Sequence, residues 1–316
     1  MGNFGDIDSA FTRDELKGGT FEPTYSGAVS FMRRKYTRDL NGVDVAVTGI
    51  PFDTATTNRP GTRFGPRHIR AESSHIAWGP PYNWDYEPFD RLAVVDYGDC
   101  HFDHGKPASI PGAIEDHIAG ILNAGAAALT LGGDHYISYP ILKAHAARHG
   151  PLSLIQFDAH TDTWADDDPT RVDHGTMFYR AVKDGIIVPE TSVQIGIRTI
   201  NDDPLGVNIL DAPFVHQNGP QAIIEQVKRI IGDNKAYITF DIDGLDPAYA
   251  PGTGTPVIGG LTPWQAQTII RGLAGINLVG MDVVEVAPAY DHSGITGLAA
   301  ATLAYDLLAL YAWDKA

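Results

Sequence analysis

Short apolar runs alternate with amphipathic segments along most of this chain. Residues 221–231 place Ile223, Ile224, Val227, Ile230 and Ile231 on one side of a helix, between Gly219-Pro220 and Gly232. Further helices are predicted over 111–124, 137–149, 262–273 and 296–312. Apolar runs typical of strands cover residues 45–49, 92–96, 127–131, 152–157, 192–197, 207–210, 236–240 and 277–284. This α/β alternation predicts a parallel sheet with helices on both faces.

The domain organisation follows from the same pattern. No Pro- or Ser-rich linker, charge block or internal repeat interrupts it, so residues 41–316 are predicted to form a single domain. Residues 1–40 are mixed polar and aromatic without a clear period, which indicates an N-terminal arm that could serve at a subunit interface. The apolar segment 298–313 contains Asp306 and is too short to span a bilayer, so it predicts a buried helix.

Three of the predicted strands are followed by potential metal ligands. Residues two apart in extended backbone point the same way, and the carboxyl ends of parallel strands share one edge of a sheet. The side chains after these strands are therefore expected to converge. The three runs are Asp158-Ala-His-Thr-Asp162, Asp241-Ile-Asp243 and Leu131-Gly-Gly-Asp-His135.

These runs together predict a metal site. An Asp at a strand end is often only a turn former or a helix cap, but three such runs are harder to explain in that way. Four carboxylates gathered in one place repel one another unless cations lie between them. Four carboxylates and two imidazoles suit a pair of divalent cations, and the predicted ligands are His135, Asp158, His160, Asp162, Asp241 and Asp243.

The ligand types also bear on the metal and the chemistry. Soft ligands are absent because the single cysteine, Cys100, lies outside all three runs. Hard carboxylates with imidazoles indicate manganese, with nickel, cobalt or zinc as alternatives. Paired metals hold a bridging water and lower its pKa, which favours hydrolysis of a poorly electrophilic carbon.

Two further residues are candidates for the reaction. His174 lies in the loop after the first ligand run and could transfer a proton to a leaving amine; the alternative is a solvated loop histidine. Glu285 ends the last strand and could hold a cationic substrate; the alternative is a buried salt bridge. His145 and His149 are expected to face solvent.

Composition sets outer limits on the function. The 316 residues carry a formal charge of -16, which two divalent metals would reduce to -12. This acidity disfavours nucleic acid and anionic lipid as partners, and it mildly favours a cationic substrate. A single cysteine fits a reducing cytosol, and the N-terminus lacks a signal-peptide pattern, so a cytoplasmic location is expected.

From about residue 43 to the C-terminus, the chain resembles ureohydrolases of the arginase/agmatinase family, and most closely the agmatinase branch. The motifs that carry this resemblance are highly specific to the family. They are Gly132-Gly-Asp-His135, Phe157-Asp-Ala-His-Thr-Asp162, Asp173-His-Gly-Thr176, Gln194-Ile-Gly-Ile-Arg198, Phe240-Asp-Ile-Asp-Gly-Leu-Asp-Pro247, Ala250-Pro-Gly-Thr-Gly-Thr-Pro256 and Val284-Glu-Val-Ala-Pro288.

The resemblance implies an arginase-like, three-layer α/β/α catalytic domain with a mainly parallel eight-stranded sheet. It implies two Mn²⁺ ions per chain and a homo-oligomer, a trimer or a hexamer. A metal-bridging hydroxide would attack the guanidinium carbon, His174 would protonate the departing amine, Glu285 would hold the guanidinium, and urea would leave. One ion would be held by His135, Asp158, Asp162 and Asp241, and the other by Asp158, His160, Asp241 and Asp243.

The substrate end of the site departs most from the family pattern. Gly244 stands where many agmatinases carry cysteine. Asp166, Asp167 and Asp168 could receive the distal ammonium of agmatine, or they could form a solvated acidic loop. Arg59 and Arg63 could instead meet a distal carboxylate.

The pattern as a whole favours a hydrolase that converts agmatine to putrescine and urea. The alternatives are a hydrolase of 4-guanidinobutanoate, free guanidine or an alkylguanidine. A single-zinc deacetylase of related fold is disfavoured, because it needs fewer ligands than the six present. A non-catalytic metal-binding subunit is disfavoured because all the expected residues are intact.

Overall fold

Eight strands form one sheet, and every pair of neighbouring strands is parallel. The protein is described by a computed structural model that covers residues 23–315. All eight predicted strands are confirmed, and the apolar runs of the central strands are buried on both faces, whereas the edge strand β6 is partly exposed. They are β1 Val45–Ile50, β2 Val94–Asp99, β3 Ala127–Gly132, β4 Ser153–Phe157, β5 Val193–Ile195, β6 Asn208–Leu210, β7 Lys235–Asp241 and β8 Asn277–Val284.

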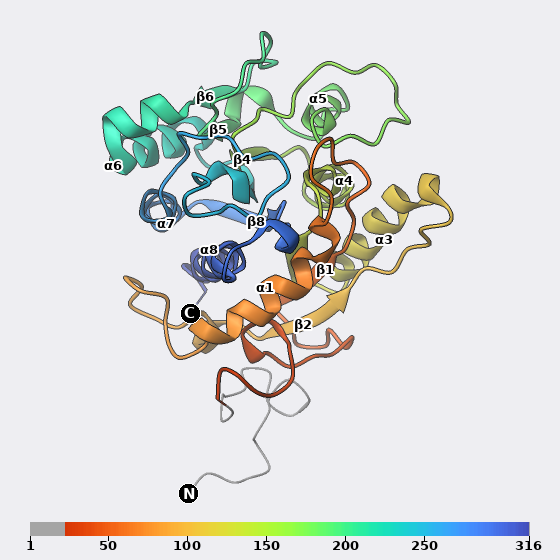
Figure 1. Ribbon diagram of the computed structural model, residues 1–316, viewed down its shortest axis with the longest axis vertical. Helices are drawn as coiled ribbons and strands as arrows, with labels where there is room; N and C mark the ends of the chain where they lie inside the picture. Colours follow the sequence, from red (N-terminus) through yellow and green to blue (C-terminus); the bar gives the residue numbers. More distant parts are fainter. Residues whose placement is uncertain (1–22, 316) are drawn as a thin grey trace, which may run out of the picture.

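Helices cover both faces of the sheet, which confirms the three-layer prediction. Figure 1 shows α1, α6, α7 and α8 along one side of the sheet, and α3, α4 and α5 along the other. Each group packs on a separate apolar core. The first group is α1 Gly65–Ser73, α6 Ala212–Ile231, α7 Pro263–Gly272 and α8 Ile295–Tyr311; the second is α3 Ile110–Asn123, α4 Ser138–His149 and α5 Met177–Lys183.

Three features of the helices differ from the sequence-based expectation. The helices α1 and α5 and the short α2 (Pro88–Arg91) were not predicted, since none has a long apolar stripe. The predicted helix over 221–231 is the second part of α6, which begins at Ala212 and is kinked where Gly219 takes a positive φ of 75° before Pro220. Proline lacks the N–H that a straight helix would need there.

The expectation that His145 faces solvent is wrong. Its side chain is fully buried in α4, its Nδ1 bonds the carbonyl of Ile141, and its ring packs on Tyr237 of β7. Burial lowers the pKa of His145 to about 4, so the ring is neutral at pH 7. The apolar C-terminal helix is buried as predicted. Over residues 23–315, none of the helices has the length and apolar character that crossing a bilayer requires.

Part of the predicted N-terminal arm packs against the sheet. Phe31 and Met32 are completely buried, and the backbone N–H of Phe31 donates to Asp96 of β2. Residues 1–22 of the arm lie outside the described residues. The boundary at residue 40 and a role for the arm at a subunit interface stay predictions.

Candidate metal centre and active site

Strand order brings the candidate residues together. The sheet runs β2-β1-β3-β8-β7-β4-β5-β6, so β3, β8, β7 and β4 are consecutive neighbours at its centre. His135 follows β3, Glu285 follows β8, Asp241 ends β7 and Asp158 follows β4. All four strands are parallel, so these side chains share the carboxyl edge, where ligands bind in sheets of this kind.

One set of ligand atoms surrounds His135. Its Nδ1 lies 3.0 Å from Oδ2 of Asp158, 3.0 Å from Oδ2 of Asp162 and 3.2 Å from Oδ2 of Asp241. All four side chains are buried. Two ligand atoms of one metal ion lie about 3 Å apart when each metal–ligand bond is about 2.1 Å long, so these distances fit ligands of a single ion.

A second set adjoins the first and shares Asp158 with it. Nδ1 of His160 lies 3.1 Å from Oδ2 of Asp243 and 3.4 Å from Oδ1 of Asp158. Asp158 therefore turns one oxygen to each set, which is the arrangement of a carboxylate that bridges two cations. Asp241 also connects the sets, because its Oδ1 accepts the backbone N–H of Asp243.

The hydrogen bonds around His135 fit a metal ligand. Its Nε2 lies 2.8 Å from Oγ1 of Thr239, whose hydroxyl donates to Asp282. That hydroxyl must therefore accept from Nε2–H, which leaves the lone pair on Nδ1. Nδ1 is buried and makes no hydrogen bond to any residue in the range 23–315. A buried nitrogen lone pair that faces three carboxylates is the environment expected around a divalent cation.

The charges of the cluster lead to the same conclusion. Burial alone lowers the pKa of His135, but Asp158, Asp162 and Asp241 outweigh it and raise that pKa well above its usual value. Burial together with the charge of Asp158 raises the pKa of Asp162 to about 7. The bare cluster thus holds extra protons, which two divalent cations would replace by balancing four negative charges.

Polar residues within and just after the strands support the ligands, and none of them was assigned a role from the sequence. Gln156 of β4 donates to Oδ2 of Asp158 and is itself bonded to Gln194 of β5. Arg198 donates to the carbonyls of Asp243 and Val257, and so fixes the loop after β7. The sequence did carry one sign of them, namely a glutamine or threonine within a strand that is buried on both faces. A buried polar side chain of this kind needs a hydrogen-bond partner.

His174 and Glu285 form a hydrogen-bonded pair beside the cluster. Nδ1 of His174 lies 2.8 Å from Oε1 of Glu285. Nε2 of His174 lies 2.9 Å from Oγ1 of Thr57 and 3.2 Å from its backbone nitrogen. Burial lowers the pKa of His174, but the bond to Glu285 and the charge of that carboxylate raise it to about 9. His174 is therefore a buried imidazolium at pH 7.

Glu285 also has an open hydrogen-bond acceptor. Its backbone φ is +64°, which a non-glycine residue rarely adopts and which marks a functional position. Oε1 accepts from His174 and from the backbone N–H of His135. Oε2 is buried and has no partner within the described part of the chain. A guanidinium N–H would satisfy it.

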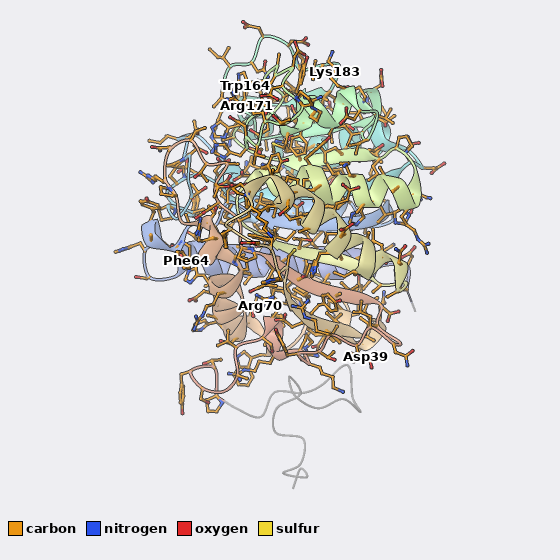
Figure 2. All side chains as sticks on the ribbon, turned by 90° about the vertical axis from the view of Figure 1, so that its right-hand side faces the viewer. Asp39, Phe64, Arg70, Trp164, Arg171 and Lys183 are labelled. Carbon is orange, nitrogen blue, oxygen red and sulfur yellow. The ribbon has the colours of Figure 1, made fainter. Side chains whose placement is uncertain are left out.

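A cavity of about 460 Å³ opens above these groups, and Asp241, His160 and His174 are among its lining residues. Trp164 and Arg171 line its outer part and lie near each other at one end of the molecule (Figure 2). The volume is in the range of small-molecule sites.

The expected substrate-binding residues differ in their positions. Asp166 lines the cavity, but Asp167 does not, because it turns away to accept the hydroxyl of Tyr179. Arg63 is paired with Asp53, and Arg59 lies over the ring of Tyr290. Neither arginine lines the cavity.

Comparisons with known proteins add the family. The model of the Arginase family matches residues 43–309 of this chain. The chain belongs to the arginase family. Family members are hydrolases of guanidino compounds that depend on a pair of metal ions, and this chain has a cluster of His and Asp side chains that could bind metal.

Individual family members resemble the chain closely. An agmatinase of Chromobacterium violaceum is 58% identical over 96% of this chain and 94% of its own length. A crystal structure of a hypothetical agmatinase from Burkholderia thailandensis is 60% identical, with a TM-score of 0.95 over 97% of this chain and 98% of the other. Proclavaminate amidino hydrolase from Streptomyces clavuligerus is 37% identical, with a TM-score of 0.86 over 92% of this chain and 99% of the other. The arginase-like fold is thereby confirmed.

Proposed function

We propose that this chain is an agmatinase, which hydrolyses agmatine to putrescine and urea with two Mn²⁺ ions. The observation that carries the proposal is that two ligand sets share Asp158, and that one cavity is lined by ligands from these sets and by His174, which is hydrogen-bonded to Glu285. A relative named agmatinase that is 58% identical over nearly the whole chain supports the substrate.

The metal ions would be held by the six carboxylate and imidazole ligands. One site is His135, Asp158, Asp162 and Asp241, and the other is Asp158, His160, Asp241 and Asp243. Hard oxygen ligands with one imidazole at each site favour Mn²⁺. When bound, such a pair supplies Lewis acidity and lowers the pKa of water, so that a nucleophile is available near neutral pH.

Glu285 orients the substrate. The guanidinium is planar and presents N–H donors, and Oε2 of Glu285 is a buried acceptor without a partner among residues 23–315. Its Oε1 stays bonded to His174 and to the backbone of His135. The Glu285 carboxylate thus positions the guanidinium carbon relative to the loop that carries His135, the first imidazole ligand.

His174 donates the proton that the leaving group needs. Water oxygen bonds to the guanidinium carbon, the bond from that carbon to the alkyl-bearing nitrogen breaks, and its electron pair leaves with the nitrogen. That nitrogen takes a proton, so the products are urea and an amine. A pKa near 9 keeps His174 protonated at pH 7, as a general acid must be. Thr57 holds the ring in both states, since its hydroxyl accepts from Nε2–H and its amide donates to bare Nε2.

The experiment that tests the proposal is a substrate panel. Purified protein loaded with Mn²⁺ is assayed for urea release from agmatine, 4-guanidinobutanoate, arginine, guanidine and butylguanidine, compared by kcat/KM. The highest value is expected for agmatine. A clear preference for 4-guanidinobutanoate or guanidine would keep the hydrolysis and overturn the substrate. Absence of urea from every member, with two ions bound per chain, would overturn the enzyme assignment.

A further inference from the structure

The outer part of the cavity holds a three-residue ion cluster. Nε of Arg171 lies 2.8 Å from Oδ2 of Asp166, and its Nη2 lies 3.0 Å from Oδ2 of Asp173. All three residues line the cavity that also contains His174 and Asp241. A linear guanidine held at Glu285 by one end would extend its other end toward this cluster.

The two carboxylates are anchored by backbone N–H groups and mostly buried, whereas the arginine side chain is half exposed. Oδ1 of Asp166 accepts the backbone N–H of Asp168, and Oδ1 of Asp173 accepts that of Gly175. Their side chains are only 17% and 16% exposed, and the Arg171 side chain is 54% exposed. A long, half-solvated side chain can leave such a pair at little cost, because exposed ion pairs contribute little free energy.

The net charge of the ion cluster determines which kind of substrate tail it would bind. Two carboxylates and one guanidinium give a net charge of -1, and both carboxylates already have their outer oxygens directed at a cation. An incoming ammonium would take the position that Arg171 now fills. An incoming carboxylate would meet two anions instead, and Arg171 would have to leave both of them to bind it.

We propose that Asp166 and Asp173 receive the distal ammonium of the substrate, and that Arg171 is an internal competitor that yields this position when a dication binds. Arg171 is then a specificity-determining residue, because it sets how strongly a cationic tail is favoured over a neutral one. The inference rests on the proposed function and names the groups that would distinguish agmatine from its neutral and anionic analogues.

The test compares agmatine with butylguanidine, whose tail is neutral. In Arg171→Gln, the ratio of kcat/KM for agmatine to that for butylguanidine should rise about threefold, because the competitor is gone. In Asp166→Asn, the same ratio should fall about threefold. General damage to the loop would lower both rates and leave the ratio unchanged.

Matched variants control for charge alone. Lys183→Gln removes a positive charge from the exposed end of α5, at the same end of the molecule as Arg171 (Figure 2). Asp202→Asn removes an exposed negative charge that does not line the cavity. Both should keep the wild-type ratio. A ratio that shifts in these variants as much as in Arg171→Gln would overturn the proposal.

A binding measurement separates this inference from the proposed function. Calorimetric titration of the Mn²⁺-loaded protein with 1,4-diaminobutane needs no turnover, and Arg171→Gln should bind the diamine about threefold more tightly. Weaker or equal binding would overturn the inference even if urea is released. If Arg171→Gln instead abolishes turnover of a preferred 4-guanidinobutanoate, Arg171 is a carboxylate receptor and the proposal is wrong.

Discussion

The Thr239 hydroxyl connects His135 to Asp282, and its removal tests how the first imidazole ligand is oriented. Thr239 is completely buried in β7, opposite Asp282 of β8. Its Oγ1 lies 2.8 Å from Nε2 of His135 and 2.6 Å from Oδ1 of Asp282. Thr239→Val keeps the shape of the side chain and removes both hydrogen bonds.

The expected loss of stability in Thr239→Val follows from the two buried groups that lose their hydrogen-bond partner. The N–H of His135 and Oδ1 of Asp282 would stay buried, and one unsatisfied buried group costs about 1–3 kcal/mol. Asp282 keeps the hydroxyls of Ser138 and Tyr237 on its other oxygen, which limits the loss. Loss of an outer partner of a metal-ligating histidine lowers metal affinity about 10–100-fold, which is about 1.4–2.8 kcal/mol. The first loss should appear in the stability of the metal-free protein, and the second in its affinity for Mn²⁺.

The assay is competitive Mn²⁺ titration against a chelator, together with chemical unfolding of the metal-free protein. Thr130→Val is the matched control, because Thr130 is equally buried in β3 but its hydroxyl has no partner within the described part of the chain. The control should bind Mn²⁺ normally and be no less stable than wild type. Equal Mn²⁺ affinity of the two variants would refute the argument that Thr239 orients His135.

Four other predictions address the site and the assembly. Asp158→Asn removes the shared ligand, so metal analysis should find one Mn²⁺ or fewer per chain and no urea release. His174→Ala should slow urea release at least about 100-fold with two ions still bound, which separates a proton donor from a ligand. Because the pKa of His174 is raised to about 9, the acid form is present below that pH, and kcat should fall as pH rises through about 9; in Glu285→Gln this loss should begin at lower pH. The predicted homo-oligomer should give the mass of a trimer or a hexamer in light scattering, and a monomer of 34.1 kDa would contradict it.

Strand positions, and the candidate ligands that follow the strands, were predictable because each depends on short-range pattern; that these residues bind metal stays a prediction. Runs such as residues 127–131 are apolar enough to be buried on both faces, and in a parallel sheet such runs end at one edge. His135, Asp158 and Asp241 were therefore expected at the same edge of the sheet, and the order of the strands makes them neighbours there. Their atomic arrangement, with one oxygen of Asp158 turned to each set, depends on the strand order, which the sequence does not display.

Other features of the site depend on tertiary contacts. The hydrogen bonds from Thr239 to Asp282 and between Gln156 and Gln194 join neighbouring strands, so only the polarity of these residues within apolar runs could have signalled a role. The burial of His145 follows from the way α4 packs on β7. The ion pairs of Arg171 with Asp166 and Asp173 follow from the conformation of one loop, which spacing does not determine.

The most direct measurement of the central claim is product analysis of agmatine turnover in ¹⁸O-labelled water by the Mn²⁺-loaded protein. Cleavage at the alkyl-bearing nitrogen predicts equimolar urea and 1,4-diaminobutane, with the label in urea alone. Release of ammonia with a carbamoylated amine would show that a different C–N bond breaks and would contradict the account.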